Sequence, residues 1–228
     1  MILDHIRLRN FRTYDDLDLH LSSGLNLVLG ENAAGKTNLV EAIQYLSLAR
    51  SWRTSDDKTL IKEGRPFASI DVSISEGDLK REIEVRIDKN AKRIKINGKN
   101  VSRLSDLSKV VNVITFSPND VKLFSESPSE RRSFLDIAIS KQSSDYFTLI
   151  CRYNKLLKER NTLLKQDHVD KDLLQVITEQ MIEASWPIMR YRMMYIASSN
   201  EIMPGLLNRL RGDSKASELV YKPFVRPD

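Results

Sequence analysis

The sequence predicts an α/β protein in which a strand-rich N-terminal lobe is followed by a helical domain. Two patterns indicate this class. Apolar and polar residues alternate with the period of a strand through much of residues 1–116, whereas apolar residues recur at helical spacing through residues 129–210. A glycine-containing loop near residue 30 separates an apolar segment from an amphipathic one, so a strand is expected to lead into a helix there.

Strands are expected over the first 30 residues. Leu17, Leu19 and Leu21 alternate with polar residues, as in a half-buried strand. Residues 25–29 are expected to form a short apolar strand that ends at Gly30. A helix should follow from residue 36 to residue 48, and its apolar positions are Leu39, Val40, Ile43 and Leu46.

Four further strands are expected in the lobe, over residues 67–75, 79–87, 91–96 and 110–116. Asn97-Gly98 follows the third of them, and this dipeptide is typical of a tight hairpin turn. The lobe is therefore expected to hold mixed and antiparallel strands around the helix that follows the glycine-containing loop.

The helical part begins where turn-forming residues, a proline and an early acidic side chain gather near residue 128. Two long helices are expected, over residues 129–165 and 171–210. Pro187 should kink or divide the second helix, because proline removes a backbone donor from the helical ladder.

These elements predict the domain organisation. We expect an N-terminal lobe over residues 1–120 and a helical domain over residues 121–215. Residues 216–228 would then begin another strand, since residues 218–221 are mostly apolar, and the chain is expected to be a fragment of a longer protein.

Composition excludes several classes of protein. The 36 Lys and Arg residues exceed the 31 Asp and Glu residues by five, and this excess lies in residues 131–165, which permits but does not require a polyanionic partner. A single cysteine excludes a disulfide framework, and the three histidines show no metal-ligand spacing in the sequence. Neither a membrane span nor a secretory signal is apparent, so a cytoplasmic protein is expected.

The strongest chemical signal is a phosphate-binding loop. Residues 30–37, GENAAGKT, fit the pattern G-x-x-x-x-G-K-[ST] at every fixed position. Glycines let consecutive backbone N–H groups point at a phosphate, and the following helix adds the positive end of its dipole. Lys36 is expected to reach the β- and γ-phosphate oxygens of ATP, and Thr37 to present its hydroxyl to Mg²⁺. The candidate residues are Gly30, Glu31, Asn32, Ala33, Ala34, Gly35, Lys36 and Thr37.

Binding a phosphate does not make the chain a hydrolase. Hydrolysis also needs an acidic residue after an apolar strand, which holds Mg²⁺ and positions water, and no suitable strand is found. A segment similar to L-S-G-G is absent, as are the N-K-x-D and D-x-x-G patterns of G proteins. The sequence therefore predicts nucleotide binding without a complete set of hydrolytic residues.

Several segments spread over residues 1–165 resemble one family. They are residues 10–14 (NFRTY), 30–38 (GENAAGKTN), 51–54 (SWRT), 116–136 (FSPNDVKLFSESPSERRSFLD) and 153–165 (YNKLLKERNTLLK). Together they resemble the RecF family, whose ATPase heads are of the ABC type shared with SMC and Rad50 proteins. The chain departs from that family's pattern at Asn119, where an acidic residue is usual, and at Glu126, where glycine is usual.

The resemblance implies a discontinuous ABC-type ATPase head, of which this chain would hold the N-terminal lobe and an inserted α-helical arm. It further implies that ATP lies between two copies of the protein, so that ATP drives formation of a homodimer and the partner supplies the missing signature segment. A full-length dimer would be a weak ATPase, and this chain alone is not expected to hydrolyse ATP.

The resemblance also implies a role in recombinational repair. RecF-like proteins bind DNA at gaps and at junctions of single and double strands, and they act with the RecO and RecR proteins. They support recombinase loading, replication restart and SOS induction. These activities are expectations that come from the family alone.

Further candidate site residues come from the same resemblance. Asn38 matches the last position of the family's nucleotide loop. Arg12 matches an arginine that approaches the phosphates in related heads, and an exposed arginine at a strand end is an equal alternative. Asn119 and Asp120 lie where related heads carry a glutamine that senses nucleotide, and either residue could replace it.

Basic residues on the expected arm permit contact with DNA. On a helical wheel, Lys155, Lys158 and Lys165 lie opposite an apolar stripe. A solvated helix face and a phosphate-contacting face both fit these lysines, and the solvated face is slightly favoured. Arg160 lies within the apolar stripe, where a guanidinium group needs a polar partner.

Two other functions are compatible with a phosphate loop. A structural head of the SMC or Rad50 type would carry a helical insertion of hundreds of residues, whereas a strand is expected again at residues 218–221. An unrelated P-loop kinase is disfavoured by the strand-rich segment after residue 67.

Overall fold

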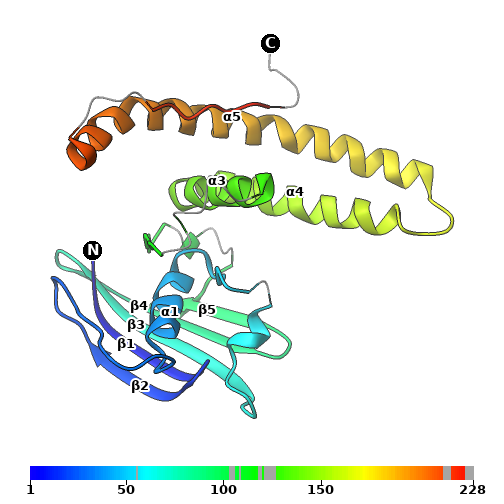
Figure 1. Ribbon diagram of the computed structural model, residues 1–228. Helices are drawn as coiled ribbons and strands as arrows, with labels where there is room; N and C mark the ends of the chain where they lie inside the picture. Colours follow the sequence, from blue (N-terminus) through cyan, green and yellow to red (C-terminus); the bar gives the residue numbers. More distant parts are fainter. Residues whose placement is uncertain are drawn as a thin grey trace. The chain divides into compact units, whose positions relative to one another are not determined.

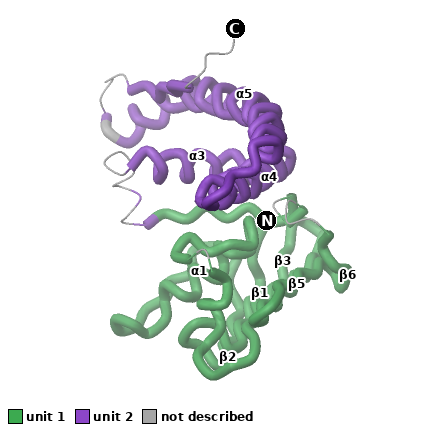
Figure 2. Tube along the Cα trace, turned by 90° about the vertical axis from the view of Figure 1, so that its right-hand side faces the viewer, with its two compact units in different colours: residues 1–116 green, residues 117–228 purple. Residues whose placement is uncertain are grey.

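The computed structural model has strands and short helices in the first part of the chain and long helices in the second, which confirms the α/β class (Figure 1). It describes residues 1–54, 56–102, 106–107, 109–117, 120, 127–212 and 217–223. The chain divides into two compact units, Met1–Phe116 and Ser117–Asp228 (Figure 2). Among the described residues, no helix has both the length and the apolar character needed to cross a membrane.

The first unit contains a six-stranded sheet in the order β2-β1-β3-β4-β5-β6, and every pair of neighbours is antiparallel. The strands are β1 (Ile2–Phe11), β2 (Tyr14–His20), β3 (Phe67–Glu76), β4 (Leu79–Asp88), β5 (Lys92–Ile96) and β6 (Lys99–Asn100). The three strands expected between residues 67 and 96 are confirmed. Asn97 and Gly98 form the expected hairpin turn, with φ values of 49° and 75° that suit the left-handed region.

One face of the sheet is covered by α1 (Lys36–Leu48) and by the short 3₁₀ helix η1 (Asp57–Leu60) (Figure 1). Alternate strand residues such as Ile6, Leu8 and Ile70 are fully buried against helix residues such as Tyr45 and Leu46. Each buried aliphatic side chain contributes about 1.5–3 kcal/mol relative to exposure. This core therefore fixes the start of α1, which follows the glycine-containing loop.

The predictions of two further strands in the first unit are wrong. Residues 25–29 and 110–116 form no strand, because within the described ranges neither segment has a neighbour to complete a ladder. Leu25, Ile114 and Phe116 are consequently open to solvent, at 93%, 90% and 84% exposure, whereas Val111 is buried in the core of the first unit. The expected apolar face of α1 also differs, since Val40 is exposed while Glu41 is fully buried.

The second unit is helical and consists of α3 (Pro128–Gln142), α4 (Ser144–Leu163) and α5 (Lys171–Arg211). The single helix expected over residues 129–165 is divided at Ser143, whose backbone is extended and whose hydroxyl caps α4 by accepting from the Tyr146 N–H. Pro187 does not divide α5. Its neighbours Ala184 and Ile188 are buried, and this packing stabilises the helix through the proline.

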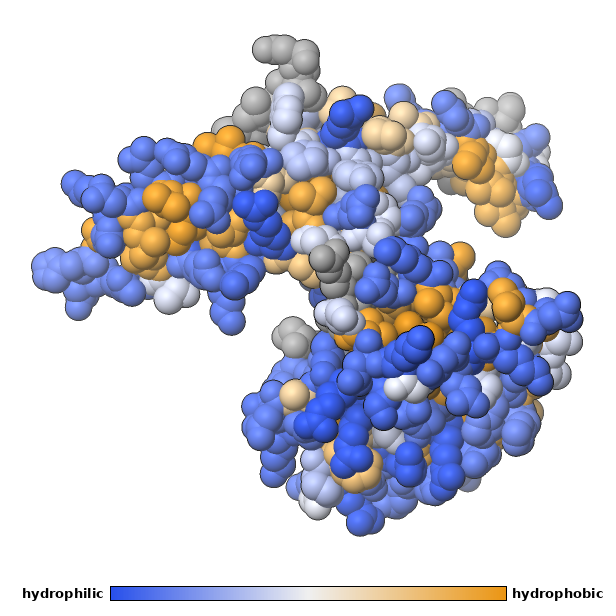
Figure 3. Space-filling model, turned by 180° about the vertical axis from the view of Figure 1, so that it is seen from behind, coloured by the Kyte–Doolittle hydropathy of each residue, from blue (hydrophilic) through white to orange (hydrophobic). Residues whose placement is uncertain are grey.

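Apolar side chains also reach the surface of the helical unit (Figure 3). On α5, the side chains of Leu173, Ile182 and Trp186 are exposed, although the same helix buries Ile177 and Ile188. The long helix therefore buries only part of its apolar surface against α3 and α4.

The expected strand at residues 218–221 is also wrong. The side-chain amide of Asn200 accepts from the Leu219 N–H and donates to the Leu219 carbonyl, both at 2.9 Å. This side chain on α5 satisfies the two backbone groups that a neighbouring strand would otherwise pair. The segment therefore lies along the helix without joining a sheet.

A partly buried polar cluster joins the three helices of the second unit. Asp136 on α3 accepts a hydrogen bond from the Tyr146 hydroxyl on α4 at 2.5 Å, and from Nη2 of Arg192 on α5 at 2.7 Å. Burial disfavours the charged guanidinium, but the adjacent Asp136 carboxylate outweighs it, and the pKa of Arg192 is raised above its ordinary value. The cluster therefore fixes the register of α5 against α3 and α4.

Replacing Asp136 tests this cluster. We expect Asp136→Ala to lower the free energy of unfolding of the helical unit by about 2 kcal/mol, since the partly buried Arg192 loses its carboxylate partner. Urea unfolding followed by far-ultraviolet circular dichroism measures the loss. Asp167→Ala is the matched control, because Asp167 is exposed. Equal stability of the two variants would show that the cluster is dispensable.

Candidate nucleotide-binding site

The loop of residues 30–35 leads directly into α1, and the two are joined at Gly35. Gly35 has φ 96° and caps the helix in the left-handed conformation. A Cβ atom at this position would lie 2.9 Å from Oγ1 of Thr13 and 3.0 Å from the ring of Tyr14. Glycine is therefore required both by the backbone conformation and by the close approach of the β1–β2 turn.

The side chain of Lys36 binds back to the first residues of the loop. Its Nζ donates to the carbonyl oxygens of Gly30 and Glu31, at 2.6 Å each. An ammonium group has three N–H donors, so these two bonds leave one for a phosphate oxygen. The lysine thus spans the loop from its last residues back to its first and places a positive charge at its centre.

The surroundings of the loop suit an anion. Glu31, Asn32, Ala33 and Ala34 are exposed, so an incoming group can reach the loop backbone. Thr37 is exposed in the first turn of α1, where the helix dipole presents its positive end. The geometry therefore supports binding of a phosphate at the start of α1.

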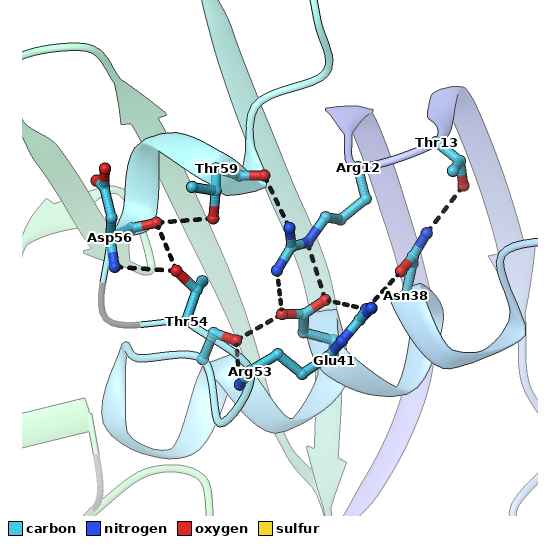
Figure 4. Close-up of polar contacts among 9 residues, drawn as sticks. Arg12, Thr13, Asn38, Glu41, Arg53, Thr54, Asp56 and Thr59 are labelled. Carbon is cyan, nitrogen blue, oxygen red and sulfur yellow. Dashed lines mark hydrogen bonds and ion pairs between the residues drawn. The ribbon is translucent and has the colours of Figure 1, made fainter.

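A buried carboxylate lies one turn further along the helix. Glu41 is fully buried and accepts two hydrogen bonds from Arg12, from Nε at 3.0 Å and from Nη2 at 2.7 Å (Figure 4). It also accepts from the Ser51 hydroxyl at 2.5 Å and from Nη1 of Arg53 at 3.0 Å. The donors come from the end of β1 and from the segment after α1, so Glu41 joins three parts of the chain.

The charge of Glu41 is retained despite burial. Loss of water around the carboxylate favours its protonated form, but hydrogen bonds from Arg12 and Ser51, together with the charges of Arg12 and Arg53, outweigh this cost. The pKa of Glu41 is therefore lowered from its ordinary value of 4.5. The carboxylate is ionised at neutral pH and holds both guanidinium groups in place.

A chain of hydrogen bonds links this ion pair to the phosphate loop. Nη1 of Arg53 also donates to Oδ1 of Asn38 at 2.8 Å, and Nδ2 of Asn38 donates to Oγ1 of Thr13 at 3.0 Å (Figure 4). The Tyr14 hydroxyl donates to the Gly35 carbonyl at 3.0 Å. The first turn of α1 is consequently fixed against the β1–β2 turn from two sides.

The residues expected from the sequence fall into two groups. Residues 30–38 lie together, and Arg12 adjoins them through Glu41, which occupies its Nε and Nη2 groups while Nη1 donates to the Thr59 carbonyl. Asp120 lies in the second unit, where its side chain accepts from the Ser117 N–H. Asn119 lies outside the described residues.

The expected arm lysines do not share one environment. Lys155 lies 3.9 Å from Glu159 on the same helix, so part of its charge is compensated. Lys158 and Lys165 instead border a surface hollow along α4, whose other lining residues are Asn154, Leu157, Asn161 and Thr162. Arg160 donates to the Thr178 hydroxyl at 3.3 Å, which supplies the polar partner expected for it.

Glu41, Ser51 and Arg53 were not among the site residues expected from the sequence. A signal for Glu41 exists, because it is a carboxylate in a short helix otherwise rich in apolar residues. Nothing in the sequence shows that its partners are Arg12 and Arg53, which lie 29 and 12 residues away. Only the folded sheet brings these three side chains together.

We expect Glu41→Gln to lower the free energy of unfolding by about 3 kcal/mol, because Arg12 keeps its charge and loses its anionic partner. The Glu41 contribution is fully present above its unfolded-state pKa and is lost as the pH falls through the lower folded-state pKa. Urea unfolding at neutral pH and under acid conditions therefore measures a difference from the parent that shrinks at low pH. Glu63→Gln, at an exposed position, is the control, and a pH-independent difference would contradict the ion-pair account.

Known proteins are similar to this chain in sequence and in fold. Residues 5–199 match the family model described as an AAA domain. The DNA replication and repair protein RecF of Clostridium novyi is 42% identical over 199 residues, covering 87% of this chain and 55% of the relative. The protein of the same name from Clostridium tetani is 38% identical over 229 residues, covering 99% of this chain and 62% of the relative.

Solved structures agree with these relatives. A structure of the recombination mediator protein RecF-ATPrS in the RecFOR pathway superposes with a TM-score of 0.85 and 32% identity, covering 93% of this chain and 58% of that chain. A second structure, of RecF-ATP, gives a TM-score of 0.83. The chain thus spans somewhat more than half the length of the proteins that it matches. The fold and the sequence together show that this chain has an AAA domain and belongs to the RecF family.

Proposed function

We propose that this chain is the ATP-binding part of a RecF-type DNA repair protein. The observation that carries the proposal is the loop of residues 30–37, in which Lys36 spans the loop and Gly35 opens α1 in the left-handed conformation. Relatives that carry RecF names, and a structure named as RecF with ATP, support the choice of nucleotide.

In this proposal the backbone N–H groups of residues 30–35 surround the phosphates, and Lys36 donates to the terminal phosphate oxygens. Thr37 presents its hydroxyl to Mg²⁺, which bridges phosphate oxygens and neutralises their charge. Asn38 and Arg12 support the loop, and Arg12 approaches the phosphates only when its bonds to Glu41 are rearranged. Asn119 or Asp120 replaces the glutamine that senses nucleotide in related heads.

The proposed activity of the whole protein needs more than this chain. Hydrolysis requires an acidic residue and a signature segment, which we assign to regions beyond the matched part and to a second copy of the protein. Residues 1–120 would serve as the lobe, residues 121–215 as the arm, and residues 216–228 would lead back to the head. The full-length dimer would be a weak ABC-type ATPase, and we expect no turnover from this chain alone.

Replacing Lys36 tests the proposal directly. We expect Lys36→Ala to weaken ATP binding roughly tenfold or more, since a charged donor to the phosphates is removed. Equilibrium binding of a fluorescent ATP analogue in the presence of Mg²⁺ measures the effect, and Lys89→Ala, at an exposed position, is the control. ATP binding by Lys36→Ala at the parent's affinity would refute the proposed site.

The same ATP-binding assay tests whether Mg²⁺ is held by the Thr37 hydroxyl. Chelation of Mg²⁺ should weaken ATP binding by the parent and leave Thr37→Ala unchanged, because that variant no longer presents a hydroxyl to the metal. A further loss of affinity in Thr37→Ala on chelation would assign Mg²⁺ to other groups.

We further propose that the whole protein binds DNA at gaps and junctions, acts with RecO and RecR, and supports recombinase loading, replication restart and SOS induction. The family supports this role, and the arm offers one candidate surface. Lys158 and Lys165 border the same hollow on α4 as the amides of Asn154 and Asn161. Cationic and amide donors in one row suit the phosphates of a nucleic-acid strand.

We expect the double variant Lys158→Ala and Lys165→Ala to weaken DNA binding uniformly across sequences. It should also reduce the slope of log affinity against log salt by roughly 0.7 to 0.9 for each phosphate that is no longer neutralised. Fluorescence anisotropy with a gapped duplex at several salt concentrations measures both effects. Lys80→Ala, on the sheet, is the control, and an unchanged slope would leave these lysines as a solvated helix face.

A further inference from the structure

Two of the three histidines, which are separated in the sequence, meet on the sheet. His5 on β1 and His20 on β2 are directly opposite each other in the antiparallel register. Their ring centroids are 4.6 Å apart. Ile6 and Leu19, the next pair in this register, point into the core, so alternation places the two imidazoles on the opposite face of the sheet.

A carboxylate completes the group. Asp18 precedes His20 by two residues and therefore lies on the same face of β2. Its Oδ1 lies 2.7 Å from Nε2 of His5. One ligand atom from each of the three side chains lies within 4.8 Å of the other two. The spacing of these residues in the sequence predicts no metal site. The antiparallel register of β1 and β2 brings the three side chains together.

We propose that His5, Asp18 and His20 form a binding site for a divalent transition metal, with Zn²⁺ as the representative ion. Two imidazole nitrogens and one carboxylate oxygen are ligands of the type that Zn²⁺ takes, and water fills the fourth position. Mg²⁺ and Ca²⁺ prefer oxygen ligands, so the site is distinct in chemistry from the phosphate loop.

The geometry needs only local adjustment to hold an ion. Tetrahedral ligands about 2.1 Å from Zn²⁺ lie roughly 3.4 Å from one another. The His5–Asp18 separation of 2.7 Å must therefore open, and the wider separations must close. His20 and Asp18 are exposed and His5 is partly exposed, so rotation of these side chains meets little resistance.

The charges of Arg7 and Asp16 affect the affinity of this site for Zn²⁺ in opposite directions. Nε of Arg7 lies 3.9 Å from Oδ2 of Asp18, and this positive charge opposes a cation. Arg7 is held by two hydrogen bonds to Asp16, at 3.0 Å and 2.7 Å, which compensate its charge.

An ion at this position would join β2 to β1. Within the part of the chain that the structure describes, β2 lies at the edge of the sheet and pairs with β1 alone. Because His5 and His20 belong to different strands, a shared metal ion adds a link across the pair. An ion that binds only the folded chain raises its thermal stability by mass action.

Zinc titration of the full 228-residue chain, prepared without a histidine tag and without nucleotide, tests the proposal. We expect saturable binding of one Zn²⁺ per chain by isothermal titration calorimetry and a rise in melting temperature with zinc. His20→Ala and Asp18→Asn should each weaken binding by roughly tenfold or more, and excess Mg²⁺ should not displace the ion.

Two controls make the outcome decisive. His168→Ala removes an exposed histidine from the second unit and should bind Zn²⁺ as the parent does. Lys36→Ala should also keep the zinc site, so failure at the phosphate loop and failure here are distinguishable. Zinc binding by His20→Ala at the parent's affinity, or no binding by the parent, would overturn the proposal.

Discussion

The charge of one buried carboxylate organises the first unit. Glu41 can remain ionised in the protein interior only while several donors surround it, because an isolated buried charge is too costly. Its donors, Arg12, Ser51 and Arg53, come from the end of β1 and from the segment that follows α1. Sheet, helix and following segment must therefore be in place together, and the same set of bonds fixes the residues on which the phosphate loop rests.

The helical unit also contains a carboxylate that several donors surround. Asp136 lies among donors from two other helices, just as Glu41 lies among donors from two other segments. In both cases an arginine distant in sequence approaches a carboxylate with limited access to water. Apolar packing of Ile139 and Ile188 brings the helices together, while the directional hydrogen bonds of the cluster select one relative register. Each unit thus combines non-directional burial with one position-specific polar contact.

Local patterns account for what the sequence could predict. The strands from residue 67 to residue 96 and the turn at Asn97 depend on alternation and on short hairpins, so they follow from nearby residues. The loop of residues 30–37 follows from a fixed spacing of glycine, lysine and threonine. The helix break at Ser143 and the partners of Glu41 and His5 could not be predicted in this way. They depend on contacts between residues that are distant in the sequence and meet only in the folded chain.

The open apolar segments of the first unit carry a consequence for the behaviour of the chain in solution. Residues 25–29, LNLVL, contain neither charge nor proline, and their leucines are largely exposed. Backbone N–H and C=O groups of such a segment can pair with an extended segment of any other chain. An extended polypeptide segment that paired with residues 25–29 would therefore cover these leucines and satisfy the backbone groups of the segment.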